Sequence, residues 1–152
     1  MRLILAVMVV ALSMSSVLTA QEKKLKKSDL PSAVQKAVGE QSTGATVTGY
    51  SSEMESGKRE YEVQMKVNGH NRDVTIAPDG TVLEIENEVE LNSLPQNVRE
   101  GLQRKAGKGT ITKIESLTKS GRLVAYEAQL KNGSKRSDIQ VGPDGNPLSH
   151  PE

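Results

Sequence analysis

The stretch that decides the fold is YEVQMKVNGHNRDVTIAPDG, residues 61–80. Apolar and polar side chains alternate over residues 61–67 and again over residues 73–76, which is the period of a half-buried β-strand. Asn68-Gly69 separates the two runs, and both residues tolerate the positive φ angles of a tight hairpin turn. Pro78-Asp79-Gly80 ends the second run with turn-forming residues. The stretch therefore predicts an antiparallel hairpin with one apolar and one polar face.

The same pattern recurs 65 residues later, at residues 126–145, and eight of the twenty aligned positions are identical. Upstream of it, the sequence Leu-Pro-x-x-Val occurs at residues 30–34 and again at residues 94–98. Self-similarity at a nearly fixed offset is typical of a repeated structural unit. The sequence thus predicts that a unit of roughly 60 residues has been duplicated once.

A helix is expected before the strands of each copy. Apolar residues at helical spacing begin at Leu30 and at Leu94, and each is followed by a proline that suits the first helical turn. Gly101, inside the second helix, costs about 1 kcal/mol relative to alanine, which predicts a close approach of this helix to the sheet. Residues 82–89 add a fourth strand to the first copy.

The predicted fold class is α+β, with two tandem units that each pack one helix on a three- to four-stranded antiparallel sheet. The first unit is expected to span residues 30–91 and the second residues 92–152. A lone unit of this size has a marginal core, which favours either two units packed together or one extended sheet. The sequence leaves open whether the two sheets merge.

The first 29 residues are interpreted as targeting and connecting segments. An apolar run after Arg2 and the small residue Ala20 fit a signal peptide over residues 1–20. The run is shorter than the roughly 20 apolar residues of a transmembrane helix. We therefore expect no membrane span after cleavage, and a periplasmic or secreted location. Residues 21–29, which include four lysines, are expected to form a basic linker.

The composition excludes several kinds of chemistry. The chain has no Cys, Trp or Phe, three Tyr and two His, so disulfides, thiol catalysis and Cys-based metal sites are excluded. Without the signal peptide, 19 basic residues balance 19 acidic ones, which argues against nucleic acid as a partner. His70 and His150 have no partner at ligand spacing and are interpreted as exposed turn histidines. The sequence predicts no catalytic residue, no metal ligand and no cofactor, and hence a protein that is not an enzyme.

Four motifs in a fixed order resemble the PepSY-like, β-lactamase-inhibitor-like repeat family. They are Leu-Pro-x-x-Val, Thr-Val-Thr, Tyr-Glu-x-Gln-x-Lys and Asp-x-x-x-x-Pro-Asp-Gly. The match occurs twice, over about residues 30–86 and 94–148. The resemblance implies an exported bacterial protein without catalytic residues, because related domains act as inhibitory modules in protease propeptides and, in tandem, in a β-lactamase inhibitor. This chain lacks the disulfides and the aromatic-rich concave face of that inhibitor, so inhibition of a β-lactamase is not expected.

The strongest candidate for a binding surface is a polar strand face whose residues are identical in both copies, whereas the apolar neighbours vary. A surface that contacts a partner would keep such residues. An alternative explanation of the identical residues is that they form cross-strand charge pairs, worth roughly 0.2–1 kcal/mol each, which were retained after a recent duplication. The six candidate residues are Glu62, Gln64, Lys66, Glu127, Gln129 and Lys131.

A second candidate is the acidic stripe, which consists of Glu84, Glu86, Glu88 and Glu90. Carboxylates at alternate positions attract Ca²⁺ or a basic partner. They are equally typical of the solvated face of a strand, where charges discourage edge pairing. The lysines of residues 23–27 are a hypothetical neutralising group for the stripe.

Together these observations predict an exported, non-enzymatic protein-binding module whose partner is an unknown exported or envelope protein. The role implied by the resemblance is inhibition or regulation of an exported protease or another envelope protein. The alternative is a periplasmic ion or ligand sensor that uses the acidic stripe from Glu84 to Glu90.

Overall fold

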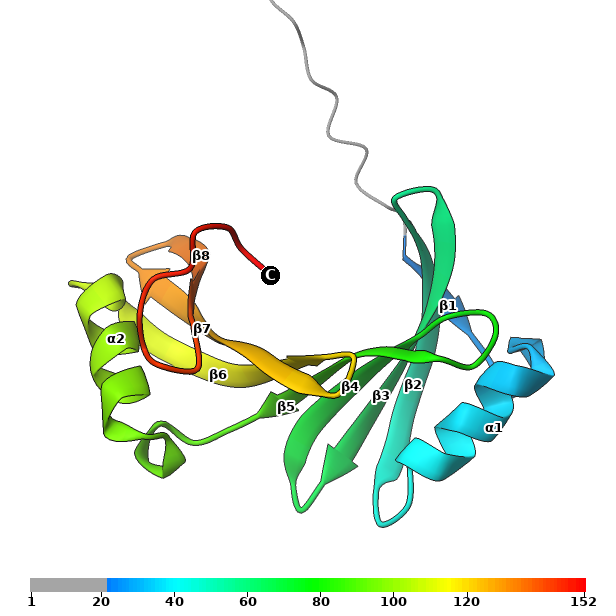
Figure 1. The fold of residues 1–152 in the computed structure, drawn as a ribbon. Helices are drawn as coiled ribbons and strands as arrows, with labels where there is room; N and C mark the ends of the chain where they lie inside the picture. Colours follow the sequence, from blue (N-terminus) through cyan, green and yellow to red (C-terminus); the bar gives the residue numbers. More distant parts are fainter. Residues whose placement is uncertain (1–21) are drawn as a thin grey trace, which may run out of the picture.

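The computed structural model describes residues 22–152, in which eight strands form one antiparallel sheet. Each strand is hydrogen-bonded to its neighbours in sequence, so the strand order is β1 to β8 (Figure 1). The strands are β1 Lys23–Leu25, β2 Thr46–Glu55, β3 Lys58–Val67, β4 His70–Ile76, β5 Val82–Glu88, β6 Thr110–Lys119, β7 Arg122–Asn132 and β8 Lys135–Val141. The helices are α1 Ser32–Gln41 and α2 Gln96–Ala106, with short 3-10 turns at Lys27–Asp29 and Leu91–Ser93.

The predicted fold class of two tandem helix-on-sheet units is wrong. Strand β5 pairs with β6 through five residue pairs, from Glu84↔Lys119 to Glu88↔Glu115, so one sheet runs through the whole described chain. Without this pairing, the N–H and C=O groups along one side of β5 would have no partner in the sheet. The protein is mostly β, with only two α-helices among the described residues.

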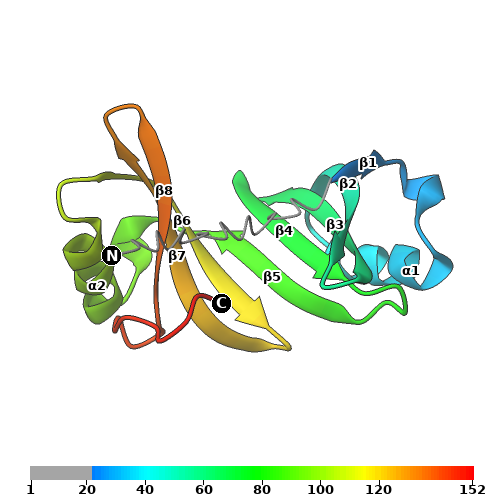
Figure 2. The ribbon, with the colours of Figure 1, turned by 90° about the horizontal axis from the view of Figure 1, so that it is seen from above.

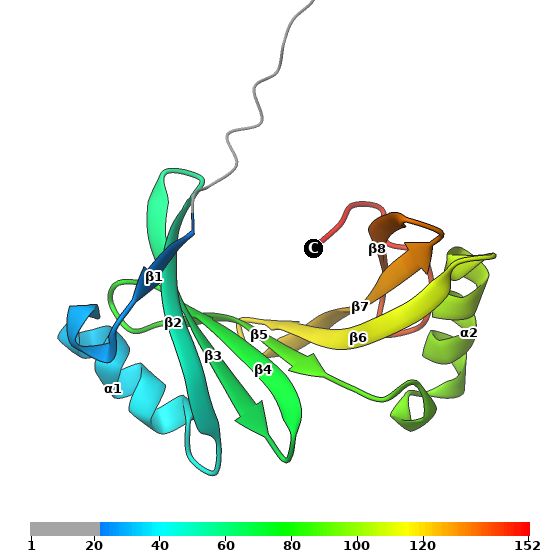
Figure 3. The same cartoon turned by 180° about the vertical axis from the view of Figure 1, so that it is seen from behind.

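Both helices pack on the same face of this sheet, where they cover two separate apolar cores. Helix α1 buries Val34 and Val38 against β3 and β4. Helix α2 buries Val98 and Leu102 against β6, β7 and β8. Figures 1 and 3 show the two helices at opposite ends of the curved sheet, on its outer side. The opposite, inner face of the sheet is not covered by either helix.

Several local predictions are confirmed. Pro31 and Pro95 stand immediately before α1 and α2, where a missing N–H costs no helical hydrogen bond. Asn68 and Gly69 have φ angles of 52° and 87° and connect β3 to β4 as a tight hairpin. The predicted strand over residues 82–89 is β5, which ends at Glu88.

The close approach predicted at Gly101 exists, but the contact is a turn and not a strand. A Cβ atom at this position would overlap the backbone of Gly145, in the turn that follows β8. The Asn97 side chain donates a hydrogen bond of 2.9 Å to the Asp144 carbonyl in the same turn. Helix α2 therefore lies directly against this turn, with no room for a side chain between them.

The N-terminal segment takes part in the sheet. Residues 23–25 of the expected linker form β1, which pairs with β2 along the sheet edge. Because four strand spacings of about 4.8 Å separate β1 from β5, the lysines lie too far away to neutralise the acidic stripe within one molecule. The predicted signal peptide lies outside the described residues. None of the described helices has the length and apolar character needed to cross a membrane.

Candidate functional site

The candidate site is the open face, which we define as the face of the sheet turned away from α1 and α2. Alternation along the strands determines which side chains it carries. Glu62 and Gln64 flank the buried Val63 of β3, whereas Glu127 and Gln129 flank the buried Ala128 of β7. Both repeated pairs therefore point to this one face. Figure 2 shows the molecule with the open face towards the viewer.

The structure does not bring the six predicted residues together. Gln64 donates a hydrogen bond of 2.8 Å to Glu62, and Gln140 of β8 donates one of 2.8 Å to Glu127. Three strands lie between β3 and β7, so the two groups are about 19 Å apart along the sheet. Lys66 and Lys131 are exposed near the strand ends. Among the described residues, none of the six forms an ion pair, which disfavours the interpretation as charge pairs.

Between the two groups lies a cluster that the sequence did not single out. Asp73 of β4, Glu86 of β5 and Glu115 of β6 each place a carboxylate oxygen within 4.8 Å of the others. We call these three residues the carboxylate cluster. Glu115 is only 6% exposed, and its carboxylate contacts the Lys113 ammonium at 2.5 Å. Among residues 22–152, Lys113 is thus the one cation that forms an ion pair with this cluster.

The cluster favours bound protons over negative charge. Burial, together with the nearby charge of Glu62, raises the pKa of Asp73 to about 6. Burial also raises the pKa of Glu86 to about 8, with further contributions from a hydrogen bond to Glu84 and from the Glu115 charge. For Lys113, the hydrogen bond and charge of Glu115 outweigh the effect of burial and raise the pKa of the ammonium. At neutral pH, Glu86 therefore keeps its proton.

Replacing Glu86 by glutamine is expected to stabilise the protein at pH 9 by about 1 kcal/mol, after allowance for solvent screening. Because the pKa of this carboxyl is higher in the folded protein than in the unfolded chain, the folded state binds more protons between the two values. Stability is therefore lost as pH rises from about 4.5 to about 8, and the substitution removes that loss. Urea unfolding at pH 5 and pH 9 measures the change in stability caused by Glu86→Gln. Glu40→Gln on exposed α1 is the control, and equal effects of both variants would contradict the assignment.

The acidic stripe does not act as one row of ligands. Glu84 and Glu88 share the open face with Glu86, but Glu84 pairs with Lys119 at 3.3 Å and Glu88 accepts the Asn71 N–H at 3.0 Å. Glu90 follows the strand and lies 4.0 Å from the Nδ1 atom of His70. The interpretation that these charges discourage edge pairing is wrong, because β5 is paired on both sides.

A second concentration of acidic groups surrounds a hollow of about 490 Å³ near the tips of the β2–β3 and β6–β7 hairpins. We call it the acidic hollow. Glu53 and Glu60, directly opposite each other on β2 and β3, both line it. Burial raises the pKa of each, and neighbouring carboxylates raise them further. The other lining residues are Glu55, Thr75, Leu83, Glu84, Lys119 and Glu152.

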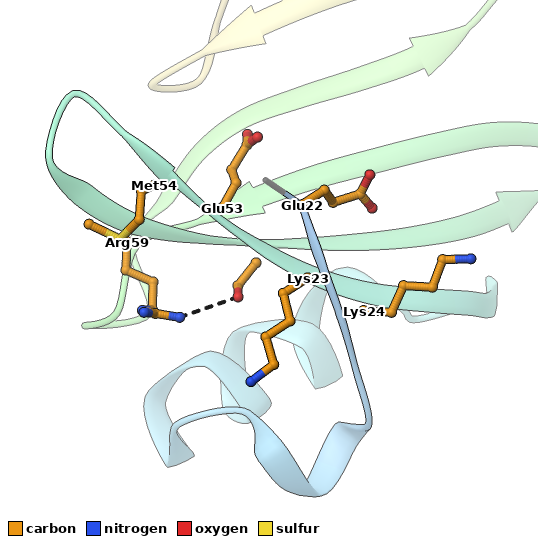
Figure 4. A pocket seen from close by; sticks show the side chains of 7 residues that line it. Glu22, Lys23, Lys24, Glu53, Met54 and Arg59 are labelled. Atoms are coloured by element: carbon orange, nitrogen blue, oxygen red, sulfur yellow. Dashed lines mark hydrogen bonds between the residues drawn. The ribbon is translucent and has the colours of Figure 1, made fainter. Parts of the chain in front are cut away.

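Another hollow, of about 530 Å³, lies at the sheet edge formed by β1 and β2. Figure 4 shows Glu22 and Lys24 on one side of β1 and Glu53, Lys23 and Arg59 on the other. The Arg59 guanidinium donates a hydrogen bond of 3.5 Å to the Ser52 hydroxyl. Because charges of both signs point to different sides, this hollow does not form a convergent site.

The signal for the missed residues was present but incomplete. Asp73 alternates with the apolar residues of its strand, which placed it on the polar face. Its contact with Glu115, however, depends on the pairing of β5 with β6, and no sequence pattern specified that pairing. Neither histidine belongs to the carboxylate cluster. His70 begins β4 and is half exposed, and His150 is exposed near the C-terminus.

No family model and no curated protein matches the chain. Three solved structures from Bacteroides species share its fold. A BLIP-like protein of Bacteroides fragilis is 20% identical, with a TM-score of 0.60 over 78% of this chain and 83% of the other. A Bacteroides eggerthii protein described as periplasmic is 16% identical, with a TM-score of 0.64 over 77% and 84%. A DUF2874 family protein of Bacteroides ovatus is 13% identical, with a TM-score of 0.62 over 79% and 85%.

At these identities the similarity concerns the fold. The β-lactamase-inhibitor-like part of the resemblance is confirmed at this level, whereas membership of the PepSY family and the duplication stay predictions. The chain has a BLIP-like fold.

Proposed function

We propose that this chain is a periplasmic, non-enzymatic module that binds another protein through its open face. The observation that carries the proposal is the asymmetry of the sheet: two helices cover one face, and the other presents partly buried polar groups. The fold neighbours support it, since one is a BLIP-like protein and another is described as periplasmic.

The electrostatics of the open face also support binding. Glu53 stands directly opposite Glu60, although like charges in such positions destabilise a sheet. Groups that reduce the stability of a free protein are commonly kept where function needs them. A partner that contacts this face would relieve the cost. The finer role, inhibition or regulation of an exported protease or envelope protein, rests on the resemblance to inhibitory modules.

Affinity capture from envelope extract tests the proposal with a charge-swapped bait. In the open-face variant Glu62→Lys, Lys66→Glu, Glu127→Lys and Lys131→Glu, four charges are reversed without a change in net charge. We expect this variant to bind the partner at least tenfold more weakly and to capture correspondingly less of it. The tenfold change corresponds to a loss of about 1.4 kcal/mol in binding free energy.

The matched control reverses two exposed ion pairs on the helices. These are Lys36–Glu40 on α1 and Glu100–Arg104 on α2, which also leave the net charge unchanged when swapped. The control bait should capture the same proteins as the unmodified one. If all three baits recover the same proteins in equal amounts, the open face is not the interface.

A cation sensor is the second candidate, favoured by the three carboxylate oxygens that lie within 4.8 Å of one another. Ca²⁺ takes six to eight oxygen ligands, and Lys113 already supplies a positive charge next to Glu115. These two points favour the binding module. Millimolar Ca²⁺ is expected to leave the melting temperature unchanged. A rise in melting temperature that Glu86→Gln abolishes would instead support the sensor.

A further inference from the structure

We propose that the acidic hollow receives a lysine or arginine side chain of the protein that binds the open face. This inference rests on the proposed function and names the chemistry of the partner. The occupant is a basic segment of another protein, and the hollow contributes carboxylates to its cationic group.

The hollow is large enough to receive a side chain of another protein. Its volume of about 490 Å³ falls in the range of roughly 300–1,000 Å³ in which protein pockets hold ligands. Its walls come from four strands, β2 to β5, together with Lys119 of β6 and the C-terminal Glu152. The hollow is therefore fixed by sheet pairing rather than by a single loop.

The charges of the hollow are not balanced from within the chain. Lys119 already pairs with Glu84 at 3.3 Å and with Glu152 at 3.9 Å. None of the ion pairs formed by the described residues involves Glu53, Glu55 or Glu60. Three carboxylates thus face the hollow without a bound cation.

Two of these carboxylates stand in a costly arrangement that a cation would relieve. Glu53 and Glu60 are direct cross-strand neighbours in a partly buried setting, where burial and then the charges of Glu55 and Glu53 raise the pKa of Glu60. A guanidinium or ammonium group between them would make charge-assisted hydrogen bonds to both. Binding would then convert repulsion into attraction, which gives the partner's cation a specific place.

Acidic groups continue from the hollow across the open face. The charge of Glu62 acts on Glu53 on one side and on Asp73 on the other, and Asp73 belongs to the carboxylate cluster. The basic residues of α2, Arg104 and Lys105 among them, are in a helix that packs on the opposite face. Although the described chain is neutral overall, its open face attracts positively charged surfaces during approach.

Binding of a defined peptide tests this inference. The probe is a short fluorescent peptide with two arginines, and its matched control carries neutral citrulline at both positions. Fluorescence anisotropy at physiological ionic strength is expected to show saturable binding of the arginine peptide by millimolar protein or below. The citrulline peptide should bind at least about tenfold more weakly, because it lacks the cation.

Two protein variants with the same change in net charge locate the site. Glu53→Gln/Glu60→Gln should weaken binding of the arginine peptide roughly tenfold and raise the melting temperature, because it removes the repulsion. Glu40→Gln/Glu100→Gln, on the helices, should leave binding unchanged. Equal binding of both peptides, or equal effects of both variants, overturns the inference.

The outcomes separate this inference from the proposed function. If the charge-swapped bait loses its partner while the peptide fails to bind, the open face is an interface but the hollow takes no cation. If the peptide binds at the hollow while all baits capture the same proteins, the cation site exists and the proposed protein-binding function is wrong.

Discussion

Replacing Lys113 by methionine is expected to destabilise the protein by about 2–3 kcal/mol at pH 9. The substitution removes the cation that pairs with Glu115, which is 6% exposed and lies within 4.8 Å of two further carboxylates. Removing one partner of a buried ion pair leaves an uncompensated charge, which typically costs 3–5 kcal/mol, and the partial exposure of Lys113 reduces this value.

The pH dependence distinguishes this effect from a loss of packing. At pH 5 the carboxyls of Asp73 and Glu86 are protonated because their pKa values are raised to about 6 and about 8. Less negative charge then remains around Glu115, so the destabilisation by Lys113→Met should be clearly smaller than at pH 9. Urea unfolding of the unmodified protein and of Lys113→Met at pH 5 and pH 9 measures this difference in stability. Lys131→Met, at an exposed position, is the control. An equal loss at both pH values would show that packing, not charge, explains the effect.

Replacing Gly101 by alanine is expected to destabilise the protein by about 1–3 kcal/mol, although alanine is the better helix former. The new Cβ atom would overlap the backbone of Gly145, and backbone atoms cannot move aside as a flexible side chain can. Gly145 has a φ angle of 76° and no space of its own for a side chain, because Asn97 lies against it. Helix α2 would have to move away from the turn, with loss of packing around Leu102.

Gly39 in α1 supplies a control with the opposite sign. It is also a helical glycine, but a Cβ atom there meets nothing within 4 Å. Gly39→Ala is therefore expected to stabilise the protein by about 0.5–1 kcal/mol. Thermal and urea unfolding of the two variants provide the comparison. If Gly101→Ala also stabilises the protein, then α2 does not lie against the turn as closely as the structure shows.

Local features of the fold could be predicted from the sequence because they depend on near neighbours. Asn68-Gly69 determines a hairpin by its backbone preferences, and Pro31 fixes a helix start by its missing N–H. The pairing of β5 with β6 joins residues that are about 30 positions apart, with α2 between them in sequence. Alternation identifies each strand but not its partner, so the prediction of two tandem helix-on-sheet units was wrong.

The candidate site shows the same limit. Strand periodicity placed Glu62 and Glu127 on polar faces, and the structure shows that these are one face. The contact of Asp73 with Glu115 requires the register across three strands, which only the assembled sheet provides. The Glu53–Glu60 pair was missed for a simpler reason: the β2–β3 hairpin has no copy with the same charges, so comparison of the repeats did not point to it.

Site-specific photo-crosslinking in cells that produce the protein tests the binding role of the open face most directly. A photoreactive residue is placed in turn at Gln64 and Gln129 on the open face, and at Lys36 and Gln103 on the helices. We expect covalent adducts with another protein from the two open-face positions and none from the helix positions. Adducts from Lys36 or Gln103, with none from Gln64 and Gln129, would contradict the account.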